Sequence, residues 1–159
     1  MNIKVQRKEL ASTKDALKNE WMRKQLNIEI KTVEGSRFID NVTKRKIKEY
    51  SLSSQNRRKF LMYCIRATIE GDYLSVTNLI RLIGVSRAAA ETMIKECEQA
   101  EWIIIKRDKG KRRRIQANDI TVETYADYCD WLWKIIDDSN MRQISASISE
   151  IEKLEQKFS

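Results

Sequence analysis

A short run of positive side chains stands out in the second half of the chain. Seven of the nine residues from Lys106 to Arg114 are lysine or arginine, and Asp108 is the single acidic residue among them. So many like charges side by side repel one another, and a polyanion that neutralises them relieves the repulsion. The residue types therefore favour binding to phosphate groups, with a solvated loop that has no partner as the alternative.

Few residues of the chain are suited to catalysis or to metal binding. There is no histidine, which removes Ser-His-Asp and Cys-His arrangements and leaves zinc only an unusual ligand set. Cys64, Cys97 and Cys129 are far apart, and each falls on the apolar side of an expected helix, so buried thiols are favoured over a redox-sensing one. No paired-carboxylate or glycine-rich phosphate motif appears. We expect no enzyme activity, no metal and no cofactor.

The basic run lies at the tip of an expected β-hairpin. The apolar, β-branched run Trp102–Ile105 suits a strand, Gly110 suits the turn, and Arg112–Gln116 is expected to return as the partner strand. Because alternate residues of a strand face opposite sides, Arg112 and Arg114 should share one face and Arg113 should take the other.

Two short helices joined by a sharp turn precede this hairpin. Apolar residues recur at helical spacing from Val76 to Ile83, with Ser75 as N-cap and Gly84 where a glycine can end a helix. Ser86 offers a second N-cap, and the next helix should run from about Arg87 to Gln99. Its inward positions, spaced by three and four, are Ala90, Met93 or Ile94, and Cys97. This is the helix-turn-helix pattern.

A helix-turn-helix followed directly by a basic hairpin resembles the winged-helix family, and the MarR-type regulators in particular, over roughly residues 54–117. The resemblance implies a mainly α fold with a small β-hairpin wing: a winged helix-turn-helix core with N- and C-terminal dimerisation helices. It makes the helix expected over Ser54–Glu70 the first core helix and Leu74 the short third strand. The family's glycine between recognition helix and wing is absent, and Glu101 stands near that place.

A protein of this pattern reads base edges with its second helix and holds phosphates with its wing. The expected contacts from the second helix are Arg87, Ala88, Ala89, Glu91, Thr92 and Lys95. Those from the wing are Lys109, Lys111, Arg112, Arg113 and Arg114. Arg87 can pair with guanine or bind phosphate, whereas Glu91 can accept from cytosine or pair with Lys95. If about six phosphates are neutralised per protomer, log affinity should fall with log salt at a slope of about −5.

Charge is divided unevenly among the three domains that we expect. The basic N-terminal helical extension, residues 1–53, carries a net charge of +6, and the winged-helix DNA-binding domain, residues 54–117, carries +7. The C-terminal helices, residues 118–159, carry −5. A basic front with an acidic back suits a protein that turns one face to a polyanion.

The N-terminal extension is the least clearly patterned part. Its first dozen residues are expected to form an arm or a frayed start, followed by a helix from about Thr13 to Leu26. Leu26–Val33 either extends that helix or forms a strand, and a helical pattern resumes over Phe38–Tyr50. The basic cluster on this last helix is either a solvated face or a second nucleic-acid contact; it comprises Lys44, Arg45, Lys46 and Lys48.

The C-terminal helices carry more apolar surface than a small core needs. The last of them has an apolar stripe spaced like a short coiled-coil seam. We expect these helices to join two copies of the chain, as the resemblance also implies, with folding back onto their own chain as the alternative. The expected interface residues are Tyr125, Tyr128, Leu132, Ile136, Ile148, Ile151 and Leu154.

Together these patterns predict a sequence-specific protein for double-stranded DNA, a transcriptional regulator that acts as a homodimer on a palindromic site. Two alternatives are a replication or partition initiator that binds repeated sites and a winged-helix module that binds protein or RNA. The sequence has no apolar run long enough to span a membrane, and its N-terminus lacks the apolar core of a signal peptide. We therefore expect a cytoplasmic protein.

Overall fold

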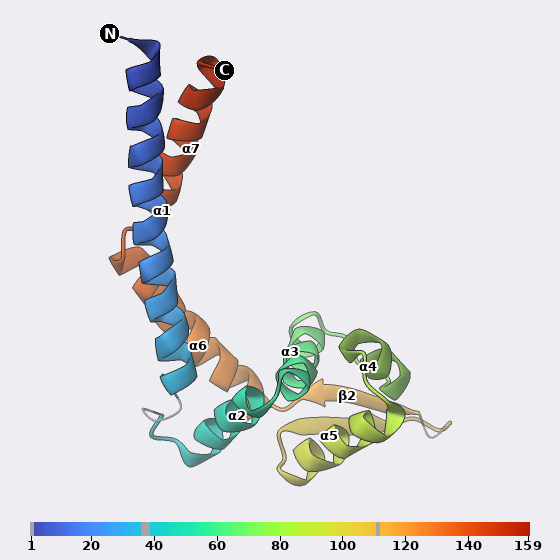
Figure 1. The fold of residues 1–159 in the computed structure, drawn as a ribbon. Helices are drawn as coiled ribbons and strands as arrows, with labels where there is room; N and C mark the ends of the chain where they lie inside the picture. Colours follow the sequence, from blue (N-terminus) through green and yellow to red (C-terminus); the bar gives the residue numbers. More distant parts are fainter. Residues whose placement is uncertain (1, 36–38, 111) are drawn as a thin grey trace. The chain divides into compact units, whose positions relative to one another are not determined.

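The computed structural model describes residues 2–35, 39–110 and 112–159 (Figure 1). In chain order its elements are α1 (Ile3–Glu34), α2 (Val42–Ser53), α3 (Gln55–Ile69), α4 (Val76–Ile83), α5 (Arg87–Gln99), β1 (Ile103–Arg107), β2 (Arg113–Ala117), α6 (Asp119–Asp138) and α7 (Met141–Lys157). A mainly helical chain with one small hairpin is the expected fold class, which is confirmed. Over the described ranges, no helix combines the length and the apolar character needed to cross a membrane.

The residues form two compact units, each described by itself. Unit 1 comprises Met1–Glu34 and Cys129–Ser159, and unit 2 comprises Gly35–Tyr128. The 54–117 range expected for the winged helix lies within unit 2.

Unit 2 is built around an apolar core to which α3, α4, α5 and the hairpin contribute. Phe60 and Cys64 of α3, Leu79 of α4, Cys97 of α5 and Ile115 of β2 are all 0% exposed. On each helix the buried positions are spaced by three or four, so one face of the helix turns inward. The α3 helix packs against β2, and α5 packs against β1.

The expected hairpin is present with antiparallel strands, and its second strand begins at Arg113, one residue later than expected. The pairs on its core face are Ile103 with Ala117, Ile105 with Ile115, and Arg107 with Arg113. On the other face, Ile104 is 39% exposed, as strand alternation requires. Leu74 forms an isolated bridge to Ile115 through reciprocal backbone hydrogen bonds of 3.0 and 2.9 Å. This bridge confirms the expected short third strand.

The junction between α5 and the wing has a backbone conformation that residues other than glycine rarely adopt. Glu101 has φ = 62° and follows Ala100, which closes α5. The Trp102 N–H donates to the Cys97 carbonyl (2.9 Å), and the Glu101 N–H donates to the Glu98 carbonyl (3.0 Å). These two bonds define a Schellman motif, whose left-handed position is usually a glycine. Glu101 therefore adopts the conformation that glycine favours at such a helix end.

In unit 1, α1 is one continuous helix from Ile3 to Glu34. The expectation of an arm or a frayed start over the first dozen residues is wrong, and the strand alternative for Leu26–Val33 is excluded. No proline or glycine interrupts the chain before Gly35. Ile28 and Thr32, four residues apart, are both buried, and the Thr32 hydroxyl donates to the Ile28 carbonyl (2.8 Å). A helix places both residues on one buried face.

The α7 helix packs antiparallel to α1. The Lys14 ammonium lies 2.7 Å from the Glu155 carboxylate, and the Lys18 ammonium lies 3.9 Å from the Glu152 carboxylate. Residues later in α1 therefore lie beside residues earlier in α7. Ile151, on the apolar stripe of α7, is only 8% exposed within the single chain. Part of the stripe expected to join two copies is therefore already covered by the chain itself.

The α2 helix begins later than its apolar pattern predicts. Asn41 is its N-cap, and the Asn41 side chain accepts a hydrogen bond from the Lys44 N–H (3.0 Å). The expected start at Phe38 lies outside the described residues. After α2 ends at Ser53, the Ser54 hydroxyl caps α3, so the polar segment between the two helices is a single residue long.

Candidate nucleic-acid interface

The three local features predicted from the sequence, two serine N-caps and a glycine at a helix end, are present in the helix-turn-helix. The Ser75 and Ser86 hydroxyls each accept a backbone N–H from the first turn of their helix, at 3.0 and 3.1 Å. Between the helices Gly84 has φ = 78°, and its N–H donates to the Ile80 carbonyl (2.9 Å). The inward positions of α5 are buried as predicted; they are Ala90, Met93, Ile94 and Cys97.

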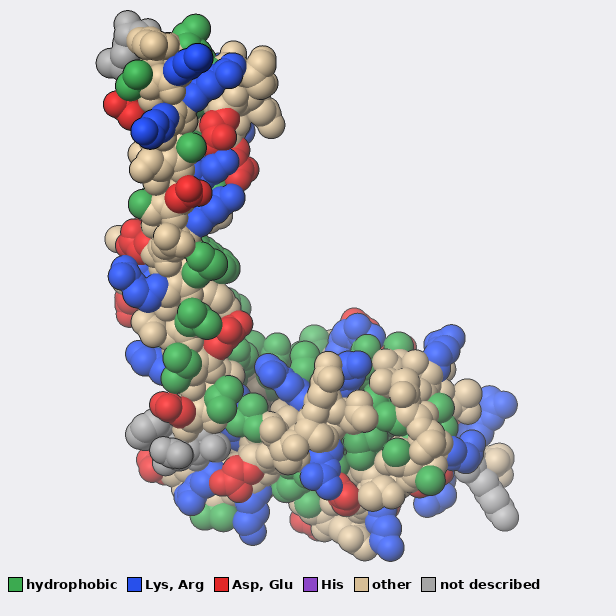
Figure 2. Space-filling view, viewed as in Figure 1, with side chains coloured by type: hydrophobic (Ala, Val, Ile, Leu, Met, Phe, Trp, Pro, Cys, Tyr) green, Lys and Arg blue, Asp and Glu red, His purple; other side chains and the backbone are tan. Residues whose placement is uncertain are grey.

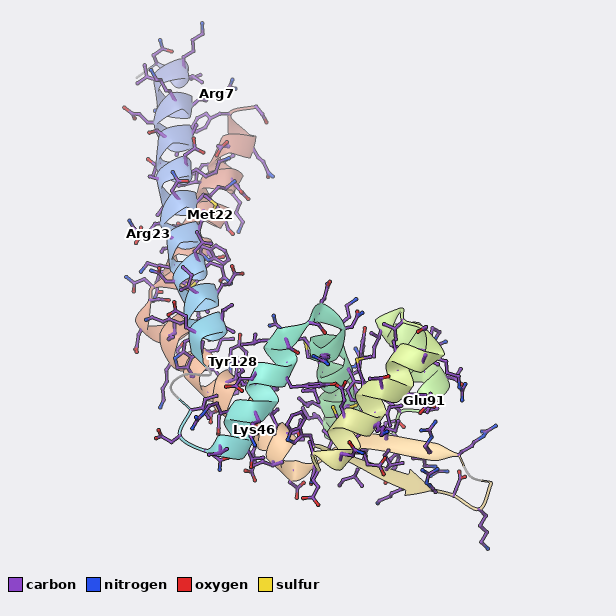
Figure 3. All side chains as sticks on the ribbon, turned by 60° about the horizontal axis from the view of Figure 1, so that its bottom comes forward. Arg7, Met22, Arg23, Lys46, Glu91 and Tyr128 are labelled. Carbon is purple, nitrogen blue, oxygen red and sulfur yellow. The ribbon has the colours of Figure 1, made fainter. Side chains whose placement is uncertain are left out.

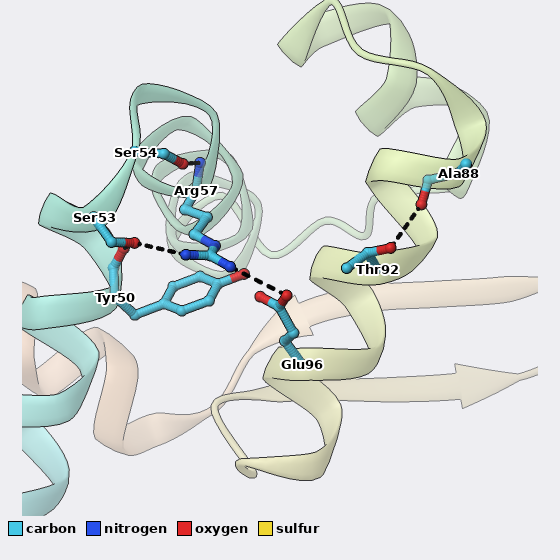
Figure 4. A network of polar contacts seen from close by, with 7 residues as sticks. All are labelled: Tyr50, Ser53, Ser54, Arg57, Ala88, Thr92 and Glu96. Atoms are coloured by element: carbon cyan, nitrogen blue, oxygen red, sulfur yellow. Dashed lines mark hydrogen bonds and ion pairs between the residues drawn. The ribbon is translucent and has the colours of Figure 1, made fainter.

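The opposite face of α5 is open to solvent. The exposed positions are Arg87, Ala88, Thr92 and Lys95, while Ala89 and Glu91 are half-buried. Within the described chain, the side chains of Arg87 and Lys95 make no hydrogen bond or ion pair. The Thr92 hydroxyl donates to the Ala88 carbonyl (3.0 Å; Figure 4), so its oxygen is left to accept a hydrogen bond from outside.

Glu91 pairs with the wing and not with Lys95. The Arg113 Nη1–H donates to Glu91 Oε2 at 2.8 Å, and the Nη2–H donates to Glu91 Oε1. Figure 3 shows Glu91 on the side of α5 that faces the hairpin. The hydrogen bonds from Arg113 lower the pKa of Glu91 from its usual value of 4.5, and those same bonds raise the pKa of Arg113. This wing–helix ion pair (Glu91 and Arg113) brings the hairpin beside the open face of α5.

The remaining basic residues of the wing are divided between paired and free side chains. Arg114 Nε lies 3.5 Å from Asp108 Oδ2, and the Arg114 and Lys106 cations lie 5.8 and 5.7 Å from the centre of the Tyr73 ring. In the described part of the wing, the exposed cations whose side chains have no hydrogen bond or ion pair are Arg107, Lys109 and Arg112. Lys111 lies outside the described residues. Figure 2 shows lysine and arginine side chains gathered at the hairpin end of unit 2.

A second polar network, drawn in Figure 4, supports the far end of α5. Arg57, near the start of α3, donates to Ser53 Oγ at 3.1 Å and to Glu96 Oε1 at 3.3 Å. Its guanidinium lies 5.0 Å from the centre of the Tyr50 ring, which packs edge-on against Trp102 at 5.2 Å. The network joins α2, α3 and α5. Sequence reasoning missed it, because no local spacing connects Arg57 with a carboxylate 39 residues further on.

The basic cluster of α2 is largely occupied by contacts within unit 2. The Lys44 ammonium lies 2.8 Å from Asp127, the Arg45 guanidinium donates to a backbone carbonyl at 3.1 Å, and Lys48 lies 4.5 Å from the centre of a tyrosine ring of α6. Burial lowers the pKa of Lys48. Lys46 is exposed and carries a label in Figure 3. Three of the four cations are thus held by the chain itself, which agrees poorly with a second nucleic-acid contact.

Two of the three cysteines are the buried small residues that the sequence predicts. Cys64 and Cys97 are both 0% exposed, and burial raises the pKa of the Cys97 thiol to about 12. Burial also raises the pKa of Cys64. Cys129 is half-buried, and all three are free thiols. The neutral, buried thiols of Cys64 and Cys97 suit packing and not redox chemistry.

Comparison with known proteins adds a likeness of fold. No protein-family model and no curated protein matches the chain. Among solved structures, the MepR–DNA complex of Staphylococcus aureus is similar over 87% of this chain and 99% of that chain, with a TM-score of 0.52 and 12% sequence identity. This chain has the winged-helix fold. In this fold α5 is the second helix of the helix-turn-helix, and β1 and β2 form the wing.

Two further structures are similar to this winged helix. MepR, a transcription regulator of the S. aureus multidrug efflux pump MepA, has a TM-score of 0.47 and 12% identity, over 74% of this chain and 93% of that chain. A MarR protein from Peptoclostridium difficile DA00132 has a TM-score of 0.42 and 20% identity, over 83% of this chain and 90% of that chain.

Proposed function

We propose that this chain is a sequence-specific protein for double-stranded DNA, a transcription regulator that acts as a homodimer. One observation carries the proposal. The outer face of α5 is not covered by unit 2, and the wing beside it presents free cations. In the winged-helix arrangement such a pair of surfaces meets adjacent parts of one duplex. The solved MepR–DNA complex, which has the same fold, supports the same use of the fold here.

The side chains of α5 are suited to the major groove. Arg87, in the first turn of the helix, can donate two hydrogen bonds to guanine or bind a phosphate. Ala88 is small enough to allow the helix backbone close to the bases and to contact a thymine methyl group. The Thr92 oxygen is free to accept a hydrogen bond from a base amino group, and Lys95 can reach the backbone.

The wing supplies contacts that do not depend on sequence. Arg107, Lys109 and Arg112 are free to bind phosphates, and with two cations of α5 they make about five contacts per protomer. Each contact contributes about −0.9 to the slope of log affinity against log salt, which gives a slope of about −4 to −5 per protomer.

A second copy of the chain would cover an apolar stripe on α1. Met22, Leu26, Ile30 and Val33 are 51%, 56%, 52% and 63% exposed, and spacings of four, four and three place them along one side of the helix. Trp133, in the same unit, is 61% exposed, and Figure 2 shows hydrophobic side chains along these helices. Contiguous apolar surface of this kind marks an interaction site. Leu154, one of the expected interface residues in the same unit, is 41% exposed.

Disruption of this stripe tests the dimer separately from DNA binding. Replacing Leu26 and Ile30 by aspartate should convert the dimer to a monomer in sedimentation equilibrium, because each change would bury a charge in the interface. Asn27→Asp is the matched control, since it adds a negative charge at an exposed position of α1 outside the stripe. A monomeric wild-type chain, or a dimer that survives both aspartates, would contradict the proposed interface.

Selection of bound duplexes from a random pool at physiological salt tests the function itself, with the mass of each complex measured. We expect a palindromic site bound by two copies, with half-sites about one helical turn apart. Direct repeats would indicate a replication or partition initiator instead. Salt-sensitive binding without sequence preference would indicate an interaction module.

A further inference from the structure

The wing–helix ion pair connects the two surfaces assigned to DNA. Arg113 is the first residue of β2, and Glu91 lies in the second turn of α5, 22 residues earlier in the chain. Two N–H groups of one guanidinium meet the two oxygens of one carboxylate. A bidentate pair fixes orientation as well as distance. The Arg113 and Glu91 side chains are 20% and 36% exposed, so the contact lies at the edge of the open face.

Strand geometry explains why Arg113, and not its neighbours, makes this contact. Arg113 stands opposite Arg107 on the core face of the hairpin, the face that carries the buried Ile115. Arg114 faces the other way, towards Asp108, and the side chain of Arg112 is exposed. Three consecutive arginines therefore have three different environments.

Without Arg113 beside it, Glu91 would weaken the binding of phosphates to this surface. An ionised carboxylate at the rim of the open face repels a polyanion. Arg113 offsets that charge, and one N–H of each of its two terminal nitrogens is occupied by the carboxylate.

We propose that Glu91 and Arg113 together position the wing against α5 and neutralise the carboxylate, so that Arg113 is a positioning residue and not a phosphate ligand. This inference rests on the proposed DNA binding for its second half, whereas the positioning of the wing is a property of the free protein.

The positioning is tested without DNA, by amide hydrogen exchange of the hairpin in the full chain. Loss of the ion pair in Arg113→Ala or in Glu91→Ala should speed exchange of the β1 and β2 amides about fivefold, the upper range for a partly exposed pair. Arg112→Ala, which removes a neighbouring free arginine, should leave exchange unchanged. Equal exchange in Arg113→Ala and Arg112→Ala would overturn the positioning role.

The shielding of Glu91 is tested by affinity for a duplex of about 30 base pairs recovered from the random pool, measured over a range of salt. Arg112→Ala should reduce the salt slope by about 0.9 per protomer. Arg113→Ala should weaken binding about tenfold at low salt, and this loss should shrink as salt screens the repulsion from the unpaired Glu91 carboxylate. The double variant Glu91→Ala/Arg113→Ala should bind more tightly than Arg113→Ala alone, because the unpaired carboxylate is gone.

The possible outcomes separate this inference from the proposed function. A double variant that binds no more tightly than Arg113→Ala overturns the shielding role while DNA binding stands. A wild-type chain that binds no duplex overturns both the proposed function and the shielding role. The exchange experiment still decides the positioning role in that case.

Discussion

Glu101→Gly should stabilise the protein, although it removes a side chain. Glu101 has φ = 62°, and a left-handed conformation costs a residue with a Cβ about 1–2 kcal/mol. Glycine removes that cost but loses about 0.5–1 kcal/mol through its greater freedom in the unfolded chain. Glycine keeps the backbone N–H of residue 101, which donates to the Glu98 carbonyl, and the carbonyl of residue 101, which accepts from Asn118 Nδ2 (2.8 Å). The other bond of the helix end joins Trp102 to Cys97 and does not involve residue 101.

The net gain in free energy of unfolding is therefore about 0.5–1 kcal/mol, or about 2 °C in Tm for a chain of this size. Urea unfolding of the full chain at constant m-value measures it. Ala100→Gly is the matched control: Ala100 has φ = −81°, so glycine relieves nothing there and should lower the free energy of unfolding by about 0.5 kcal/mol. Glu101→Ala keeps the left-handed strain and should leave stability nearly unchanged. A Glu101→Gly variant no more stable than wild type would refute the reasoning.

Three further predictions concern the polar contacts and thiols of unit 2. Because Arg113 lowers the pKa of Glu91, the ion pair should stabilise the fold fully above the ordinary value of 4.5 and lose that effect as pH falls through the lowered pKa. The stability difference between wild type and Glu91→Gln in urea should therefore be constant from about pH 8 to pH 5 and vanish in acid. Arg57→Ala should lower the free energy of unfolding by about 1 kcal/mol, since Glu96 loses its partner, and an unchanged urea midpoint would contradict this. At about pH 8 iodoacetamide should modify Cys97 only after unfolding, as followed by peptide mass spectrometry, because its pKa is about 12; equal rates in native and unfolded protein would count against its burial.

Local signals explain why the helix-turn-helix was predictable. Ser75, Gly84 and Ser86 each act within one turn of their own position, so their roles can be recognised from neighbouring residues alone. The strand alternation of the hairpin is equally local, and it placed Arg113 on the opposite face from Arg114. Arg112 lies outside β2.

Contacts between distant elements explain what the sequence did not reveal. Two alternatives were expected for Glu91, a contact with cytosine or a pair with Lys95 on the same helix, whereas the structure pairs it with Arg113 from the wing. The rule for side-chain pairs on a helix considers only residues three or four positions apart. Tertiary packing instead places Arg113, a stronger bidentate partner, against the Glu91 carboxylate. The continuous α1 was missed for a related reason, since its buried positions are fixed by the packing of unit 1 and not by a strong amphipathic pattern.

A competition experiment tests most directly whether the open face of α5 contacts DNA. It measures how wild type and Ala88→Asp each bind the selected duplex in the presence of a scrambled duplex. Ala88 is exposed on that face in the first turn of α5, so an aspartate there leaves the core intact and places a negative charge against the groove. We predict that wild type prefers the selected duplex by about a thousandfold and that Ala88→Asp, with an unchanged Tm, loses this preference. Binding of the selected duplex by Ala88→Asp as tight as that of wild type would contradict the account.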